Sequence, residues 1–290
     1  MLKESQQSLV ERVMARRPVK VIAVTSGKGG VGKTNVATNI AVALGQCRRN
    51  VMLLDADLSL ANVDVLLGLQ PQFNLAHVVG GDADLASTIM QGPGDIRIVP
   101  ATSGNHAMTD LPNASQAAII HAFAELPDQP EILVIDTASG ISPSVARFVQ
   151  ASQQAVVVMC DEPASITDAY ALIKVFSRHY GISHFQIVTN QTRDTADGHR
   201  LFDKVRKVTD RYLDVVLRHL GNIPEDRFLR RAVQEQRAVV DAYPRSGSSK
   251  AFREIACRID RIPVRASNGN IEFFFERLLQ GPVVQTGGGA

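Results

Sequence analysis

The sequence lacks long apolar runs and has few cysteines. No hydrophobic run approaches the ~20 residues that a membrane-spanning helix needs, and no charged segment followed by an apolar one opens the chain, so we expect no secretion signal. The three cysteines, Cys47, Cys160 and Cys257, match no metal-binding or disulfide spacing. Each is therefore predicted to be a small buried hydrophobic residue in a reducing cytoplasm.

The 290 residues are 45% hydrophobic, which suits one large α/β domain with short tails. We expect an N-terminal leader over residues 1–17, a domain over 18–265, and a linker, short amphipathic helix and disordered tail over 266–290. Short apolar runs, several of them continuous as in strands covered on both faces, predict strands at Val19–Thr25, Val51–Leu54, Ile96–Val99, Ile132–Ile135, Ala155–Met159, Phe185–Thr189 and Val215–Leu220.

Helical patterns separate many of these runs, at Ala114–Glu125, Ser165–Tyr180, Ala196–Leu213, Glu225–Gln236 and Ser248–Ile262. Ser165 with Asp168 forms a candidate capping box for the second of these helices. The alternation predicts a doubly wound, mostly parallel sheet with helices on both faces. Ligands of such sheets bind at the carboxyl ends of the strands.

Residues 27–34 read Gly-Lys-Gly-Gly-Val-Gly-Lys-Thr, which fits the phosphate-binding P-loop between a strand and a helix. The glycines allow backbone N–H groups to converge on phosphate oxygens, and the helix N-terminus adds partial positive charge. Lys33 is predicted to reach the β- and γ-phosphates, and Thr34 to bind Mg²⁺. The predicted nucleotide-binding residues of this segment are Gly27, Lys28, Gly29, Gly30, Val31, Gly32, Lys33, Thr34 and Asn35.

Acidic residues follow two later strands. Asp55 and Asp57 come at the end of the second predicted strand, and Asp136 ends the run Ile-Leu-Val-Ile that begins at Ile132. A carboxylate at this edge of the sheet can orient Mg²⁺ or an attacking water near bound phosphates. A single aspartate at a strand end is usually a turn or cap residue, but three in this order after a P-loop favour a nucleotide-hydrolysing site.

Lys28 is not required by the general P-loop. Residues 28–34, Lys-Gly-Gly-Val-Gly-Lys-Thr, resemble the signature of the deviant Walker A ATPases, the MinD/ParA family. The resemblance implies ATP and Mg²⁺ as cofactors and catalytic roles for Lys28, Lys33 and Asp57. Lys28 would cross a dimer interface to the partner's nucleotide, and Asp57 would position the hydrolytic water. Metal contacts are implied for Thr34, Asp55 and Asp136.

The same resemblance suggests an adenine pocket. In the family, an asparagine after one strand contacts the base, and a Pro-Glu-Asp turn after another lines the pocket. The matching residues here are Asn190, Pro224, Glu225 and Asp226. Taken alone they are ordinary turn residues.

Segments 57–68, 160–174, 236–246 and 271–278 resemble the FleN/FlhG branch, regulators of flagellar number, and the overall likeness covers roughly residues 18–280. This implies a cytoplasmic ATPase that forms a homodimer on ATP. It would restrain the flagellar transcription activator FleQ, work opposite the GTPase FlhF, and lie in part at the inner face of the cell membrane or the cell pole. Many proteins of this branch open with an element that stimulates FlhF. The leader of this chain keeps little of that element, so stimulation of FlhF stays an open alternative.

Other functions of this fold fit the sequence less well. Iron–sulfur carriers of this fold need a cysteine directly after the second acidic motif or a late Cys-x-x-Cys, and the sequence has Gly-Ile-Ser at residues 140–142 and a single late cysteine, Cys257. Related tyrosine kinases need a tyrosine-rich tail, but the last tyrosine here is Tyr243. A ParA-like DNA-partitioning ATPase is the main alternative, beside a MinD-like regulator of the division site. Residues 200–265 carry sixteen Lys and Arg against nine Asp and Glu. We interpret this excess as solvated helix faces and do not expect direct DNA binding.

Near the C-terminus, Ile271, Phe274, Phe275 and Leu278 fall on one face of a predicted helix over residues 271–279. A reversible membrane contact through this helix and docking onto the chain's own domain are equally good interpretations. Its glutamates argue against an anionic lipid surface.

Overall fold

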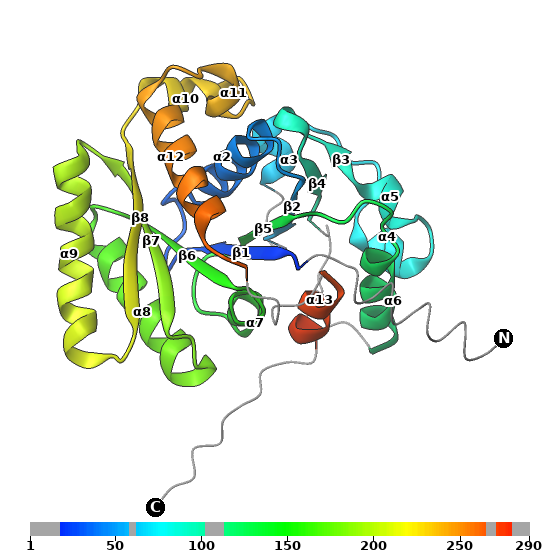
Figure 1. Ribbon diagram of the computed structural model, residues 1–290, viewed down its shortest axis with the longest axis horizontal. Coiled ribbons are helices and arrows are strands. Elements are labelled where there is room, and N and C mark those ends of the chain that lie inside the picture. The colour runs from blue at the N-terminus through cyan, green and yellow to red at the C-terminus, as the bar shows by residue number, and fades with distance from the viewer. Residues whose placement is uncertain (1–17, 58–61, 102–112, 265–270, 280–290) are drawn as a thin grey trace, which may run out of the picture.

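A computed structural model describes residues 18–57, 62–101, 113–264 and 271–279. Its core is an eight-stranded sheet in the order β3-β4-β2-β5-β1-β6-β7-β8 (Figure 1). The strands are β1 Lys20–Thr25, β2 Val51–Ala56, β3 Met90–Gln91, β4 Arg97–Val99, β5 Ile132–Thr137, β6 Gln154–Cys160, β7 His184–Thr192 and β8 Val216–Pro224. All neighbouring strands are parallel except β3 and β4.

Helices cover both faces of this sheet. They are α2 Lys33–Gln46, α3 Val63–Leu67, α4 Leu75–Gly80, α5 Leu85–Thr88, α6 Asn113–Ala124, α7 Pro143–Ala151, α8 Pro163–Tyr180, α9 Thr195–Tyr212, α10 Arg227–Gln234, α11 Val239–Ala242, α12 Gly247–Arg261 and α13 Ile271–Leu279, with a 3₁₀ turn, η1, at Pro93–Asp95. The predicted doubly wound, mostly parallel α/β fold is confirmed. Within the described ranges, no helix combines the length and apolarity needed to cross a bilayer.

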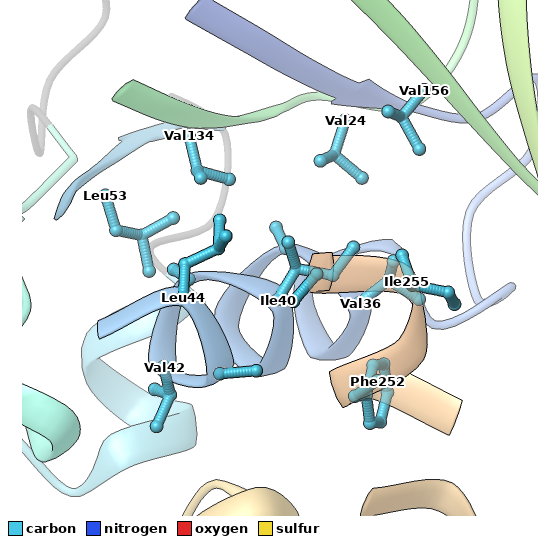
Figure 2. Packing of buried hydrophobic residues seen from close by; sticks show 14 of the residues in the cluster. Val24, Val36, Ile40, Val42, Leu44, Leu53, Val134, Val156, Phe252 and Ile255 are labelled. Carbon is cyan, nitrogen blue, oxygen red and sulfur yellow. The ribbon is translucent and has the colours of Figure 1, made fainter. Parts of the chain in front are cut away.

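Helix α2 is the centre of one covered face. Its residues Ile40 and Leu44 point toward the sheet, where they meet Val24, Leu53 and Val134 (Figure 2). Helix α12 closes the same cluster from outside α2 with Phe252 and Ile255 (Figure 2). Helices α7, α8 and α9 cover the opposite face with a second apolar cluster. The central strands β1, β2 and β5 are buried along their whole length, which explains their continuous apolar sequences.

Helix α13 packs back onto the domain. Its residues Ile271, Phe274, Phe275 and Leu278 are buried, and the rings of Phe275 and Phe123 of α6 stack with centroids 4.0 Å apart. Figure 1 shows α13 beside α6 and α7. The predicted apolar face of this helix is therefore in contact with the domain in this structure.

Some local predictions were wrong. Ser165 is not an N-cap, because α8 begins at Pro163 after Glu162; the Ser165 hydroxyl instead accepts a hydrogen bond from the backbone N–H of Cys160. Helix α7 was not foreseen, and neither were strand β3 and the short helices α3, α4, α5 and α11. Elements this short carry too few residues for a periodic pattern.

The interpretation of all three cysteines as buried residues also needs correction. Cys160 is buried on β6, but Cys47 and Cys257 are exposed. Cys47 follows the last turn of α2, and Cys257 lies on the outer side of α12. Their residue type predicts burial, but their helix positions place them on the surface.

Candidate nucleotide-binding site

The P-loop connects β1 to α2 in the expected strand–loop–helix arrangement. Gly30 and Gly32 have φ values of +82° and +86°, a region that other residues rarely adopt. A Cβ atom on Gly32 would lie 2.5 Å from Nδ2 of Asn190, and one on Gly27 would lie 2.3 Å from the backbone of Asp168. These glycines are therefore needed both for the loop's shape and for its close packing against β7 and α8.

Lys33 joins the P-loop to both acidic motifs. Its ammonium group is buried and donates a hydrogen bond to Oδ1 of Asp136 at 2.7 Å, and it lies 3.9 Å from Oδ2 of Asp57. Burial raises the pKa of Asp136, and Lys33 opposes that shift. Three residues predicted from separate motifs thus meet at one point at the carboxyl edge of the sheet.

The residues near this point fit a hydrated Mg²⁺ bound together with phosphate. Oδ2 of Asp136 is buried and has no hydrogen-bond partner, and Thr34 lines the adjoining cavity. The described residues contain no cluster of three or more His, Cys, Asp or Glu side chains that could hold a metal on their own. Mg²⁺ commonly keeps several waters and takes one or two protein ligands plus phosphate oxygens, so Thr34 and Asp136 are a suitable protein contribution.

Asp55 has a second task in the structure. Its Oδ1 accepts the backbone N–H of Asp57 at 3.0 Å, and its Oδ2 accepts those of Asn62 and Val63 at 3.1 Å each. Burial and the nearby Asp136 raise the pKa of Asp55 to about 7. The carboxylate thus holds the start and end of the loop that carries Asp57, and its role beside the metal stays a prediction.

A cavity of about 600 Å³ opens beside the P-loop. Its lining combines P-loop, acidic-loop and helix residues: Ser26, Gly29, Gly30, Gly32, Lys33, Thr34, Asn35, Asp57, Asn62, Val65, Leu66, Ser139, Val233 and Gln236. Gln236 donates a hydrogen bond to the carbonyl of Val65 at 3.1 Å. Sequence reasoning missed Val65, Val233 and Gln236 as site residues, because they come from surface segments with no chemical motif.

The predicted adenine residues have structural tasks of their own. Asn190 is buried, and its Nδ2 donates to the carbonyl of Val31 at 2.8 Å, while its Oδ1 is buried without a partner. Asp226 caps α10 through the backbone N–H of Phe228 and also accepts from the N–H and hydroxyl of Ser248. Glu225 forms an ion pair with Arg230.

None of Asn190, Pro224, Glu225 and Asp226 lines the 600 Å³ cavity. The adenine assignment therefore stays a prediction. The free Oδ1 of Asn190 is its strongest support, because an adenine amino group can donate to it.

Lys28 lies at the surface of the P-loop. Its Nζ is 2.7 Å from Oε2 of Glu162, the residue before α8, and the two side chains are 41% and 55% exposed. The Glu162 carboxylate raises the pKa of Lys28, so this lysine carries its charge at neutral pH. Unlike Lys33, it contacts none of the predicted metal-binding residues.

Comparison with known proteins agrees with this geometry. The family model "CobQ/CobB/MinD/ParA nucleotide binding domain" matches residues 22–239. The chain is 51% identical to the antiactivator FleN of Pseudomonas aeruginosa over 94% of its own length and 98% of that protein. This chain belongs to the MinD/ParA nucleotide-binding family, in the group of FleN.

Two further similarities extend the comparison. The flagellum site-determining protein YlxH of Helicobacter pylori is 29% identical over 90% of each chain. The septum site-determining protein MinD of Pyrococcus horikoshii, solved with Mg-ADP, matches with a TM-score of 0.67 and 27% identity over 84% of this chain and 97% of that one. The MinD/ParA fold inferred from the P-loop thus extends over most of the molecule.

Proposed function

We propose that this protein is a Mg²⁺-dependent ATPase that forms a homodimer on ATP and, in that state, restrains a flagellar transcription activator such as FleQ. The observation that carries the proposal is the meeting of Lys33, Asp57 and Asp136 beside the P-loop glycines. The 51% identity to an antiactivator supports the regulatory part.

The residues divide the work of hydrolysis among them. Among the described residues, the partners of Lys33 are carboxylates, and the lysine exchanges them for phosphate oxygens when ATP binds. Thr34 and Asp136 would hold Mg²⁺, which neutralises charge on the phosphates. Asp57 stands at the cavity, where its carboxylate can orient a water for attack on the terminal phosphate.

Dimerisation rests on Lys28. A charged, half-exposed lysine beside the phosphate loop is free to reach a second molecule, much as an arginine finger acts in trans. Its ion pair with Glu162 is exposed and therefore weak, because solvent screens the attraction between the two side chains. Exchange of Glu162 for the partner's phosphates would cost little.

The loop that carries Asp57 and the segment Thr137–Gly140 can transmit the nucleotide state. Both adjoin the cavity, through Asp57 and Ser139 respectively, so a bound γ-phosphate can order them and set the surface beside them. A partner that reads this surface would bind only while ATP is intact. Membrane or cell-pole contact through α13 would require its release from α6. Any contact of the leader with FlhF lies outside the described residues.

Light scattering with nucleotide tests the switch. Wild-type protein should double its mass with ATP and Mg²⁺ but not with ADP, and Asp57→Ala should stay dimeric after ATP is added because hydrolysis is blocked. Lys28→Ala should stay monomeric, whereas the matched variant Glu162→Gln, which frees the lysine, should still dimerise. A wild-type mass that ignores nucleotide would overturn the proposal.

A pull-down tests the regulatory step. Asp57→Ala should capture the activator and Lys33→Ala should not, and a deletion strain should carry too many flagella. Equal capture by both variants would remove the nucleotide switch. Unchanged flagellation with mis-segregated DNA, together with a salt-sensitive gel shift on duplex DNA, would favour the ParA-like alternative.

A further inference from the structure

A buried carboxylate lies behind the nucleotide cavity. Asp55 is 1% exposed and is the register partner of Asp136 on the neighbouring strand β5, so the two side chains leave the sheet on the same side. Asp136 forms an ion pair with Lys33, and the other ion-pair partner of this lysine among the described residues is Asp57. Asp55 is therefore a buried acidic group that the contacts of Lys33 leave unused.

Three backbone N–H groups satisfy this carboxylate. The N–H of Asp57 donates to Oδ1 at 3.0 Å, and those of Asn62 and Val63 donate to Oδ2 at 3.1 Å each. A buried carboxylate without such partners is costly. The chain is therefore stabilised with these three N–H groups aimed at Asp55, which fixes the backbone at Asp57 relative to the start of α3.

The residues that Asp55 holds reach the cavity, although Asp55 does not. Asp57 and Asn62 line the cavity beside the P-loop, and Asp55 is absent from its lining. Val63 is fully buried in the apolar cluster around α2 and is the first residue of α3. The side chain of Asn62, the residue before α3, does not cap that helix, so Asp55 accepts bonds that a local cap residue does not supply.

We propose that Asp55 is a positioning residue for ATP hydrolysis, which acts by holding Asp57 at the cavity and not as a metal ligand. This inference rests on the proposed function, in which Asp57 orients the attacking water. The carboxylate of Asp57 lies 3.9 Å from Nζ of Lys33, so its backbone anchor sets its place beside the phosphates. A misplacement of about 1 Å in such a group can lower a reaction rate about 100-fold.

The variant Asp55→Asn separates the two roles. Asparagine keeps the size of the side chain but has a single accepting oxygen, and its other terminal atom is a donor. If the oxygen faces Asn62 and Val63, the NH₂ group faces the N–H of Asp57, and the two donors repel each other. The backbone at Asp57 then shifts, while the P-loop and Asp136 keep their contacts.

Steady-state kinetics and calorimetry test this separation. Asp55→Asn should lower kcat about 100-fold and leave the Kd for ATP within about threefold of wild type. The Mg²⁺ concentration needed for half-maximal hydrolysis should also stay within about threefold, whereas loss of a metal ligand would raise it. Asp64→Asn is the matched control: this aspartate lies on α3 and accepts the N–H of Val65 at 2.8 Å at the surface, so its variant should hydrolyse ATP like wild type.

A double replacement tests whether Asp55 acts through Asp57. The protein with both Asp55→Asn and Asp57→Asn should hydrolyse ATP no more slowly than the one with Asp57→Asn alone, because a positioning residue has no effect once the group that it positions is lost. Single-turnover hydrolysis extends the measurement to these slow rates. Losses that multiply would show that Asp55 acts independently of Asp57 and would overturn the proposal.

Hydrogen exchange followed by NMR, without nucleotide, tests the contact itself. The amide protons of Asp57, Asn62 and Val63 should be protected in wild type and in Asp64→Asn, and should exchange at least about tenfold faster in Asp55→Asn. Unprotected amides in wild type, or an Asp55→Asn protein that circular dichroism shows to be unfolded, would overturn the proposal. A wild type without ATPase activity would instead remove the proposed function, whereas an active wild type with an equally active Asp55→Asn would remove this proposal alone.

Discussion

The two ends of helix α2 meet opposite surroundings. At its N-terminus, Lys33 is buried with Asp136, and a carboxylate oxygen of Asp136 has no partner. At its C-terminus, Arg49 pairs with Asp260 and Glu131 at the surface, where water can satisfy whatever the pairs do not. Buried charges with unused bonding capacity are costly and mark a site built for a ligand. The exposed charges at the C-terminal end satisfy one another, which indicates that this end of α2 serves only to attach α12.

The largest expected effect comes from breaking the buried end. Lys33→Ala removes the cation that we propose faces the phosphates, and it leaves Asp136 buried without its counter-charge. ATP affinity should fall at least 100-fold, equivalent to more than about 2.7 kcal/mol. Calorimetric titration of ATP checks this, with circular dichroism to confirm that the variant folds. A folded variant that binds ATP within fivefold of wild type would exclude Lys33 from phosphate binding.

The docked C-terminal helix allows a second comparison, between its two faces. Phe275 is fully buried against Phe123, whereas Phe273 is 38% exposed. Phe275→Ala should lower the free energy of unfolding by about 3 kcal/mol because it leaves a cavity and removes a stacked ring. Phe273→Ala should cost less than about 1 kcal/mol. Urea unfolding measures both, and equal costs would mean that α13 does not dock in solution.

The sequence predicted the carboxyl edge of the sheet better than the contacts made by surface segments. The P-loop, Asp57 and Asp136 could be placed from sequence because each follows a buried strand and the carboxyl ends of parallel strands meet at one edge. The doubly wound sheet followed from its continuous apolar strands. Contacts made by surface segments could not be foreseen.

Three residues show why. Gln236 reaches the cavity from a loop after α10, and its bond to Val65 depends on how two remote helices pack. Asp55 has the residue type and position of a metal ligand, yet its oxygens accept three backbone N–H groups. Cys47 was expected to be buried, yet its place after the last turn of α2 leaves it exposed. Spacing along the chain holds no information on such tertiary packing.

A third prediction concerns pH. His219 of β8 shares a hydrogen bond with Thr189 at 3.0 Å and stacks on Phe202. Burial lowers the pKa of His219 to about 4, and the nearby His199 and Arg258 add to the shift. The unfolded chain, with a pKa of about 6.5, therefore binds this proton more readily than the folded one. The contribution of His219 to the free energy of unfolding is therefore complete above about pH 6.5 and is lost as the pH falls toward 4.

At pH 5 this loss should be about 1 kcal/mol relative to pH 7, after allowance for the partial exposure of the ring. His219→Gln keeps a polar group at the position but cannot take up the proton. The difference between wild type and variant in urea unfolding should therefore shrink as the pH falls. A difference that is the same at pH 5 and pH 7 would show that His219 does not titrate in this range.

The smallest expected effect is at the exposed end of α2. Arg49→Ala removes ion pairs whose side chains are 30–42% exposed, so solvent already screens much of their attraction. Its cost in unfolding free energy should stay below about 1 kcal/mol, and ATP affinity should not change. Double replacement with Asp260→Ala measures the pair itself, and the coupling should be a few tenths of a kcal/mol. A coupling above about 2 kcal/mol would show that the contact between α2 and α12 depends on charge, and that the apolar cluster around Phe252 and Ile40 does not suffice to hold the two helices together.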